Sequence, residues 1–313
     1  MPSAIFLLAI SGLLSTHEAV GGRDIDLASP PTAIAPRTET APSKPYLPAR
    51  AARARPPHSR YSLTIPLDPP GDPLPIPKIY GTPGRPLVVI DAGHGGHDPG
   101  AVSPATGKRE KDITLAVAKA IQNELMRSGR VRVALTREDD RFLILGERSA
   151  MAHGIKADLF ISIHADSAPA DTASGATIHT LSEVASDREA LLLAQRENRA
   201  DIINGVNLGK QRSEVASILL DLAQRETMDN SAAFANLLKR EATGLMPFKP
   251  DYHRMAGFVV LKAPDTPSIL LELGYVTNDE DTDRLLSDTG KRNIATGIRR
   301  AVEIHFARRL AVR

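Results

Sequence analysis

Two histidines follow short apolar runs that have the length of buried strands. His94 stands in a glycine-rich turn after the run 87–90, and His164 directly ends the run 159–163. A single histidine after a strand is more often a hydrogen-bonded structural residue than a ligand. Two parallel strands that each deliver a histidine to the same sheet edge, with a carboxylate nearby, match the three-ligand open site of a catalytic zinc centre. Since the chain contains no cysteine, any metal must be held by His, Asp or Glu.

Three carboxylates are candidates for the remaining ligand. Glu110 lies just ahead of the first expected helix, after the loop that leaves His94, so a short return brings it back to the metal. Asp98, next to a proline, suits a turn, and Asp112 suits a helix cap. The residues alone leave the third ligand open. His97, only three residues beyond His94, is interpreted as exposed or facing the substrate.

A fourth carboxylate, Glu272, occupies an unusual position at the end of the apolar run 269–271. Burying a carboxylate costs several kcal/mol unless it is paired or bound to metal. One interpretation is a structural salt bridge. The other is a general base whose pKa is raised by apolar surroundings and which takes a proton from water activated by the metal.

These residues sit in an alternation of strands and helices that begins near residue 85. Strand, helix and strand repeat twice up to residue 164, which indicates a mostly parallel sheet and places functional groups where strands end. The predicted fold is therefore α/β, a single domain with a mostly parallel twisted sheet flanked by helices. The expected strands are 87–90, 131–135, 159–163, 258–261 and 268–272, and the expected helices are 112–128, 145–153 and 292–309.

Residues 183–244 interrupt this alternation with a long charged stretch of helical periodicity. Three helices are predicted there, at about 183–203, 213–225 and 230–241. We interpret the stretch as a helical insertion within a catalytic domain that spans 85–313.

The first 84 residues differ in composition from the rest. An apolar run at 4–14 suits a signal peptide over residues 1–20 and is too short to span a bilayer, although a buried N-terminus is the alternative because no Lys or Arg precedes it. Residues 21–84, rich in Pro, Ala and Arg, predict a disordered linker. No transmembrane anchor beyond the signal peptide is expected. A net charge of +2 without a long basic block argues against a nucleic-acid partner.

Four ordered blocks of the sequence resemble a known family, the zinc N-acetylmuramoyl-L-alanine amidases represented by the periplasmic amidases of Gram-negative cell division. The blocks are VVIDAGHGGHDPGA (88–101), GKREKDITL (107–115), ADLFISIHAD (157–166) and ILLELGYVTN (269–278). The resemblance implies Zn²⁺ ligation by His94, Glu110 and His164, with Glu272 as catalytic acid and base. It also implies a peptidoglycan substrate, cleaved between N-acetylmuramic acid and L-alanine, and a periplasmic location. Arg148 and Asp166 fall in family-like positions, where each could equally form a structural ion pair.

The helical insertion is similar to the one in regulated members of that family, in which a helix covers the zinc cleft and a glutamate takes a metal position. The matching segment, 194–201, nominates Glu197 as an autoinhibitory ligand, against the alternative of a solvated helix face. Apolar residues at 215–222 are either core or a surface for an activator, which the resemblance implies is a LytM-type protein. Such members usually carry a folded wall-binding domain at the N-terminus, for which we expect residues 21–84 to be too short and too rich in proline.

Two other functions compete with the amidase. A catalytically dead wall-binding module is disfavoured because all four expected residues, His94, Glu110, His164 and Glu272, are present. A different zinc hydrolase, such as a carboxypeptidase, is disfavoured only by the four family blocks.

Overall fold

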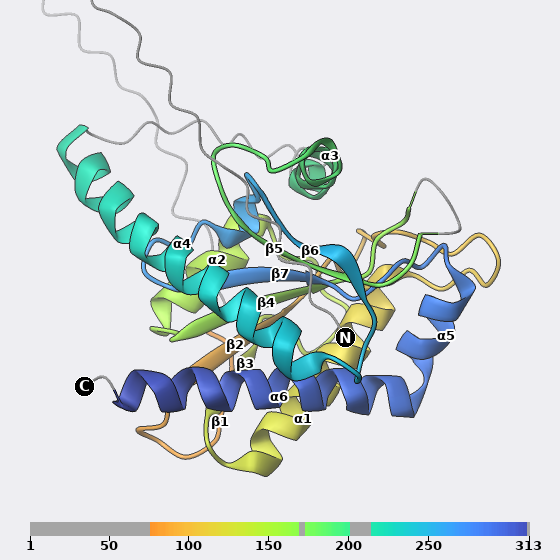
Figure 1. The fold of residues 1–313 in the computed structure, drawn as a ribbon, viewed down its shortest axis with the longest axis horizontal. Helices are drawn as coiled ribbons and strands as arrows, with labels where there is room; N and C mark the ends of the chain where they lie inside the picture. The colour runs from red at the N-terminus through yellow and green to blue at the C-terminus, as the bar shows by residue number, and fades with distance from the viewer. Residues whose placement is uncertain (1–75, 169–172, 201–213, 312–313) are drawn as a thin grey trace, which may run out of the picture. The chain divides into compact units, whose positions relative to one another are not determined.

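The computed structural model describes residues 76–168, 173–200 and 214–311, and for residues 214–223 it describes only the backbone. These segments belong to one compact unit (Figure 1). The predicted signal peptide at 1–20 and the predicted linker up to residue 75 lie outside the described residues. Among the described residues, no helix combines the length and the apolar content that a membrane crossing needs.

The unit is built on a sheet of seven strands in the order β1-β3-β2-β4-β7-β5-β6. The four central strands, β3, β2, β4 and β7, are parallel, whereas β1 runs antiparallel to β3 and β5 runs antiparallel to β7. The edge strand β6 is parallel to β5. The strands are β1 (Ile79–Tyr80), β2 (Leu87–Ala92), β3 (Arg132–Leu135), β4 (Leu159–His164), β5 (Ala176–Leu181), β6 (Phe248–Ala256) and β7 (Ser268–Glu272).

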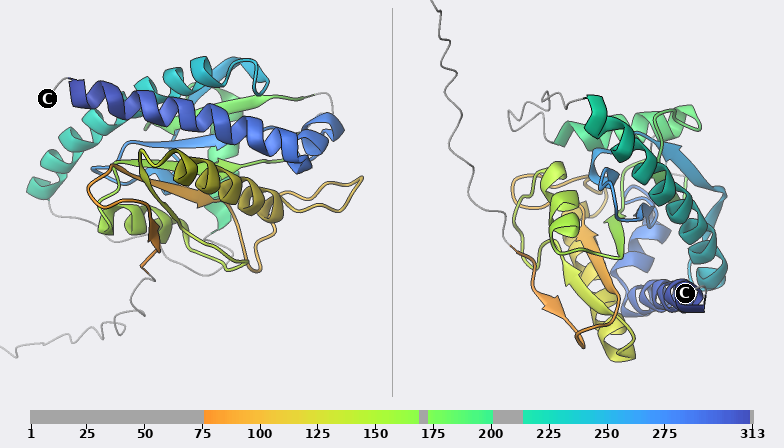
Figure 2. Two further views of the ribbon diagram at one scale, coloured as in Figure 1. Left: turned by 90° about the horizontal axis from the view of Figure 1, so that it is seen from below. Right: turned by 90° about the vertical axis from the view of Figure 1, so that its left-hand side faces the viewer.

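Helices cover both faces of the sheet, which confirms the predicted α/β class. On one face, Val88 and Ile90 of β2 share an apolar core with α1, α4 and α6, and Figures 1 and 2 show α4 and α6 lying together beside the sheet. On the other face, Leu87 and Val89 pack with α2, α3 and the 3₁₀ turn η3. The helices are α1 (Glu110–Ser128), α2 (Leu145–Gly154), α3 (Arg188–Glu197), η1 (Asn198–Ala200), α4 (Glu214–Ala242), η3 (Val259–Leu261), α5 (Asp279–Leu286) and α6 (Asp288–Ala311).

The first helix begins earlier than its polar signals predict. Arg109 is the N-cap residue of α1, so the assignment of Asp112 as the cap is wrong. Asp112 lies in the first turn and forms an exposed ion pair with Arg109 at 2.7 Å. The early start makes Glu110 the first residue of the helix. At the other end Gly129, with φ of 65°, closes the helix in the left-handed conformation that glycine adopts without strain.

Three further expectations about the sheet differ from the structure. The run 258–261 is not a strand but contains the turn η3, whose Val260 and Leu261 are buried in the second core. A short apolar run has no periodicity that separates a strand from a buried turn. Strands β5 and β6 were not predicted, because polar residues interrupt both of them. The sheet also begins before residue 85, with β1 pairing to β3.

The region 183–244 divides into two parts with different surroundings. Helix α3 lies at the strand ends, whereas α4 is a single helix that spans the second and third predicted helices. Phe234 and Leu238 in the second half of α4 are fully buried in the main core. Packing against α6 therefore holds this half of α4 in place. The segment 215–222 lies outside the residues whose side chains are described.

Candidate metal centre

His94 is held just beyond β2 by a buried ion pair beneath it. Asp91, fully buried in β2, pairs with Arg148 at 2.8 Å, and Arg148 also donates hydrogen bonds to the carbonyls of Ala92 and His94 at 2.8 Å each. Arg148 is thus a structural residue of the turn. His94 has φ of 60°, a left-handed conformation that costs a non-glycine residue about 1–2 kcal/mol and is retained where the surroundings enforce it.

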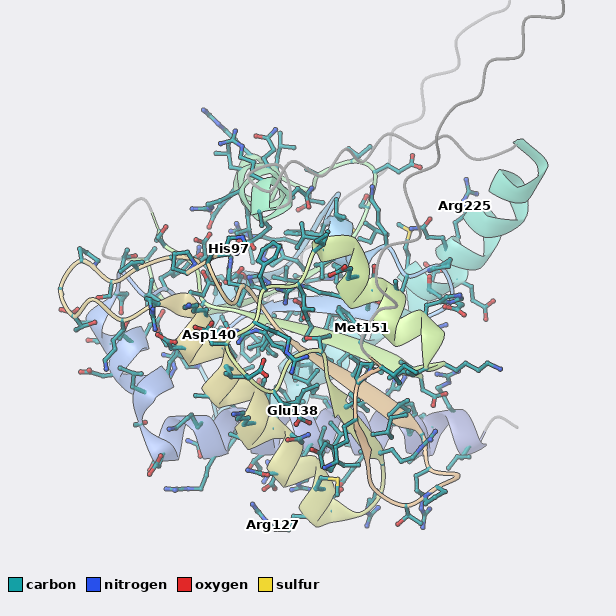
Figure 3. All side chains as sticks on the ribbon, turned by 180° about the vertical axis from the view of Figure 1, so that it is seen from behind. His97, Arg127, Glu138, Asp140, Met151 and Arg225 are labelled. Carbon is teal, nitrogen blue, oxygen red and sulfur yellow. The ribbon has the colours of Figure 1, made fainter. Side chains whose placement is uncertain are left out.

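The orientation of the His94 ring is fixed by Asp98. Asp98 Oδ2 lies 2.9 Å from His94 Nδ1, which leaves Nε2 facing the strand ends, while Asp98 Oδ1 accepts a hydrogen bond from the Gly100 amide at 3.1 Å. Metal-ligating histidines ordinarily place their second nitrogen on such a carboxylate. Asp98 therefore serves both the predicted turn and the ring of His94. His97, labelled in Figure 3, is exposed. Its ring packs against that of Phe142 at a tilt of 35°, with ring centroids 4.3 Å apart.

Glu110 and His164 meet His94 from two other elements. Glu110 is fully buried, and its two carboxylate oxygens accept hydrogen bonds from the amides of Ala101 and Ala165 at 2.9 Å each. Its Oε1 lies 3.1 Å from His94 Nε2 and 3.2 Å from His164 Nδ1. The approach requires glycine at position 93, because a Cβ there would lie 2.6 Å from the His164 ring.

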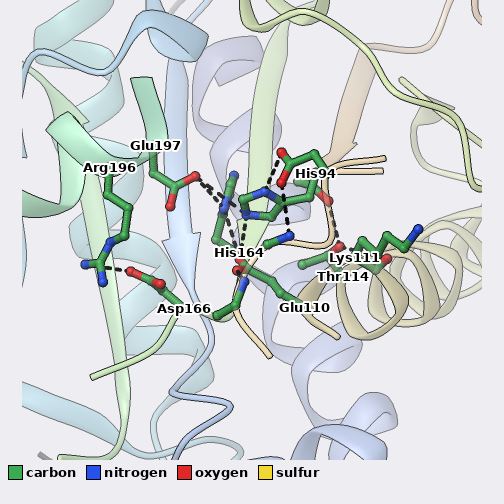
Figure 4. Close-up of polar contacts among 12 residues, drawn as sticks. His94, Glu110, Lys111, Thr114, His164, Asp166, Arg196 and Glu197 are labelled. Atoms are coloured by element: carbon green, nitrogen blue, oxygen red, sulfur yellow. Dashed lines mark hydrogen bonds and ion pairs between the residues drawn. The ribbon is translucent and has the colours of Figure 1, made fainter. Parts of the chain in front are cut away.

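Glu197, the last residue of α3, enters the same cluster from the opposite side (Figure 4). Its Oε2 lies 3.2 Å from His164 Nδ1 and 3.6 Å from His94 Nε2. On α3 the buried positions are 190, 193, 194 and 197, which is one helical stripe. The first three are apolar and pack in the second core. A glutamate that continues an apolar stripe is the sequence signal for an inward-facing carboxylate.

These donor atoms fit a divalent cation. Ligand atoms at about 2.0–2.1 Å from a tetrahedral zinc stand about 3.3–3.4 Å from one another. The four separations between the two imidazoles and the carboxylates of Glu110 and Glu197 range from 3.1 to 3.6 Å. His94 Nε2 is buried without a hydrogen bond among the described residues. The possible ligand atoms of His94, His164 and Glu197 all lie within 4.8 Å of one another.

The electrostatics of the cluster also favour a cation. Burial opposes protonation of His94, but the carboxylates of Glu110 and Glu197 raise the pKa of His94 well above its ordinary value. Burial likewise opposes ionisation of Glu110, yet the two imidazoles hold the pKa of this carboxyl well below its usual range. A buried group of two carboxylates needs positive charge nearby, which a metal ion supplies without protonating the histidines.

Glu272 stands beside this cluster on the neighbouring strand. In the parallel register of β4 and β7, Glu272 is the partner of His164. Its Oε2 accepts a hydrogen bond from the Asp166 amide at 3.2 Å, and its Oε1 is buried without a partner among the described residues. Burial, together with the charges of Asp166 and Glu110, raises the pKa of Glu272 well above its ordinary value. Within the described chain no Lys or Arg pairs with Glu272, so the structural salt bridge is not found.

Asp166 belongs to the contact between the strand ends and α3. Asp166 Oδ2 pairs with Arg196 of α3 at 2.7 Å. Burial raises the pKa of Asp166 to about 7, and repulsion by Glu110 and Glu197 adds to this rise. Next to this pair lies a cavity of about 300 Å³ between α3 and the ends of β5, β6 and β7, and its lining includes Glu272. The buried Glu272 therefore lies against a cavity next to the cluster.

The chain is similar to known proteins over most of its described length. Residues 88–304 match the family model described as N-acetylmuramoyl-L-alanine amidase. The chain is 36% identical to N-acetylmuramoyl-L-alanine amidase AmiA from Escherichia coli over 231 residues, covering 74% of this chain and 79% of AmiA. It is also 36% identical to the amidase AmiC from Neisseria meningitidis over 230 residues, covering 72% of this chain and 55% of AmiC.

Two solved structures share the fold. The catalytic domain of CwlV, an N-acetylmuramoyl-L-alanine amidase from Bacillus (Paenibacillus) polymyxa var. colistinus, matches with a TM-score of 0.51 at 28% identity, covering 73% of this chain and 99% of that domain. The amidase AmiC2 of Nostoc punctiforme matches with a TM-score of 0.53 at 27% identity, covering 72% of this chain and 98% of AmiC2.

Proposed function

The chain belongs to the N-acetylmuramoyl-L-alanine amidase family, and we propose that it is a zinc-dependent member that detaches the stem peptide from the glycan of peptidoglycan. The bond cleaved is the amide between the lactyl group of N-acetylmuramic acid and L-alanine. The observation that carries the proposal is the buried cluster in which His94, Glu110 and His164 converge beside Glu272. A carboxypeptidase accounts less well for the family match, and a dead binding module leaves this cluster unexplained.

In the proposed reaction His94, Glu110 and His164 hold the metal, and Asp98 orients the His94 ring. Zinc at this position would supply Lewis-acid polarisation of the amide carbonyl and would make water more acidic. Glu272 accepts the proton of the attacking water and then delivers it to the leaving nitrogen of L-alanine. A raised pKa suits this role, because it makes the Glu272 carboxylate a stronger base towards the attacking water.

We also propose that this structure is a resting form of the enzyme. A catalytic zinc site needs one position that no protein ligand takes, and Glu197 stands where that position would lie. Polar contacts of the residues on either side of Glu197 anchor this end of α3. Arg196 pairs with Asp166, and the Asn198 side chain exchanges hydrogen bonds with the backbone of residues 257 and 259 at 2.9 Å.

Release of α3 would then require a partner protein, which by family resemblance is of the LytM type. Leu191 and Leu192 of α3 are 45% and 51% exposed and offer apolar contact area to such a partner. The substrate places the enzyme at the cell wall, and we propose the periplasm as its location and cell separation or wall turnover as its role.

Metal dependence tests the zinc proposal. Stripping the purified full chain with a chelator is expected to reduce peptide release from sacculi by at least about a hundredfold, since the chemistry relies on Lewis-acid activation. Zn²⁺ at one equivalent per chain should restore the rate, and Mg²⁺ should not, because imidazole nitrogens are poor magnesium ligands. Full activity in a preparation shown by elemental analysis to hold no zinc would refute zinc as the cofactor.

A further inference from the structure

At one end of the cavity beside Glu272, three donors surround a single carboxylate. Glu189 of α3 places Oε1 2.8 Å from Lys249 Nζ and 3.3 Å from the Tyr275 hydroxyl, and its Oε2 lies 2.6 Å from Arg254 Nη1. Lys249 and Arg254 belong to β6, and Tyr275 follows β7. None of the three donors comes from α3 itself. Both oxygens of the carboxylate are thus bound by groups of the sheet.

The two cationic donors are largely buried, whereas the carboxylate that they bind is about half exposed. The side chain of Arg254 is 6% exposed and that of Lys249 is 16% exposed, but that of Glu189 is 52% exposed. Arg254 is fixed independently of α3, because it pairs with Asp251 of its own strand and donates from Nε to the Asp251 carbonyl at 3.3 Å. The Lys249 Nζ lies 5.1 Å above the Tyr275 ring. The group of donors formed by Arg254, Lys249 and Tyr275, here called the receptor, would therefore persist without Glu189.

The receptor would carry excess positive charge if α3 moved away, and this charge would favour the binding of an anion. Arg254 and Lys249 contribute two positive charges, and Asp251 on the same strand balances one of them. The remaining negative charges come from α3, namely Glu189 and Asp187, whose Oδ1 lies 3.6 Å from Arg254 Nη1. Without α3, Arg254 and Lys249 keep only one counter-charge between them, which favours a carboxylate ligand that forms strong charge-assisted hydrogen bonds with both.

The sheet register sets the distance from this receptor to the chemistry. Glu272 is paired with Thr177 of β5, and Arg254 is paired with His179, two residues farther along β5. Two strand spacings of about 4.8 Å and two residues of about 3.4 Å separate the Glu272 and Arg254 backbones by about 12 Å. The side chains shorten that gap. An extended peptide of two or three residues, at about 3.3–3.6 Å each, spans it.

Of the two halves of the substrate, only the peptide offers a free carboxylate at this distance. The lactyl carboxyl of N-acetylmuramic acid is consumed in the scissile amide, and the rest of the sugar presents hydroxyl and acetamido groups. Resting on the amidase function proposed above, we infer that Arg254, Lys249 and Tyr275 form a subsite for a free carboxylate of the stem peptide. Glu189 occupies this subsite in the resting form.

A matched pair of substrates tests the subsite. Two disaccharide-peptides that differ only in a free carboxylate or a carboxamide on the second stem residue are digested by the full chain with Zn²⁺. One buried charge-assisted pair is worth about 1.5–3 kcal/mol, or roughly 10–100-fold. The wild-type protein should therefore show a kcat/KM about tenfold or more higher for the free carboxylate.

Arg254→Gln should bring the ratio of the two kcat/KM values to within about twofold of unity, given the loss of the charged donor. The ratio is the readout because loosening α3 changes both rates together. Lys249→Gln, at a more exposed position, should lower the ratio in the same direction and serves if Arg254→Gln does not fold. Arg199→Gln, an exposed position that lines the same cavity, should leave the ratio unchanged.

The outcomes separate the subsite from the proposed function. If the wild-type protein cleaves both substrates with equal kcat/KM, or if both variants keep its preference, then Glu189 is only a latch for α3 and the subsite is refuted. If neither the wild-type protein nor the Glu197→Ala protein cleaves either substrate at the lactyl amide, the amidase proposal itself fails.

Discussion

Replacing Glu272 with alanine is expected to lower kcat by about 10²–10⁴-fold while the protein keeps its zinc, the usual loss when a general acid-base group is removed. Glu272 is buried beside His164, and its Oε1 has no partner among the described residues, so this carboxylate is available to move a proton. The metal should remain, because His94, Glu110 and His164 contact one another in the cluster. Among the described residues, Glu272 makes no such side-chain contact with His94 or Glu110.

The measurement is the rate of peptide release together with the zinc content of the same preparation. Glu272→Gln keeps an oxygen that can accept the hydrogen bond from the Asp166 amide. Because an amide side chain cannot take a proton at neutral pH, this variant should lose as much activity as the alanine variant. Glu280→Ala, at an exposed position in the first turn of α5, should match the wild-type protein. Loss of zinc from Glu272→Ala with an unchanged fold would reassign this residue as a metal ligand.

Glu197→Ala should raise the activity of the protein without any partner. The change removes the carboxylate that lies 3.2 Å from His164 Nδ1 and frees the position a substrate carbonyl or water needs. States that respond to partners are commonly populated at about 0.1–10%, so the gain available from full release is roughly tenfold or more. The basal rate on sacculi is the quantity to measure.

The anchors of α3 limit what this single change achieves. Arg196 and Glu189 hold the helix independently of Glu197, and Ala190 and Leu193 on its inner face are buried. Combining Glu197→Ala with Arg196→Gln should therefore give a higher basal rate than Glu197→Ala alone. Arg188→Ala, an exposed substitution on the same helix, is the matched control and should leave the rate unchanged. Equal rates in the wild-type protein and the double variant would leave α3 without a regulatory role.

Much of the site geometry follows from local sequence. His164 and Glu272 end continuous apolar runs, and parallel strands bring such ends to one sheet edge, so their proximity was predictable. The place of Glu110 was not, because it depends on a return loop whose path is set by contacts with Ala101 and Ala165. On residue type alone Asp98 and Asp112 competed with Glu110, and the family resemblance singled Glu110 out.

The parts that sequence reasoning missed depend on tertiary packing. Asp98 was interpreted as a turn residue, and nothing local reveals that its second oxygen reaches the His94 ring. Strand β6 carries charged residues because Arg254 and Lys249 meet Glu189 on α3, so its composition reflects a neighbour that is distant in sequence. The run 258–261 is apolar because it packs against α2, and local pattern gave it the wrong type.

The bond that the protein cleaves tests the central claim most directly. Purified sacculi are digested with the Glu197→Ala protein and Zn²⁺, and the soluble products are identified by mass spectrometry with labelling of new amino termini. The amidase predicts peptides that begin with a free L-alanine amine and glycan that keeps intact N-acetylmuramic acid with a free lactyl carboxyl. Products cut within the peptide, with L-alanine still attached to the sugar, would contradict it.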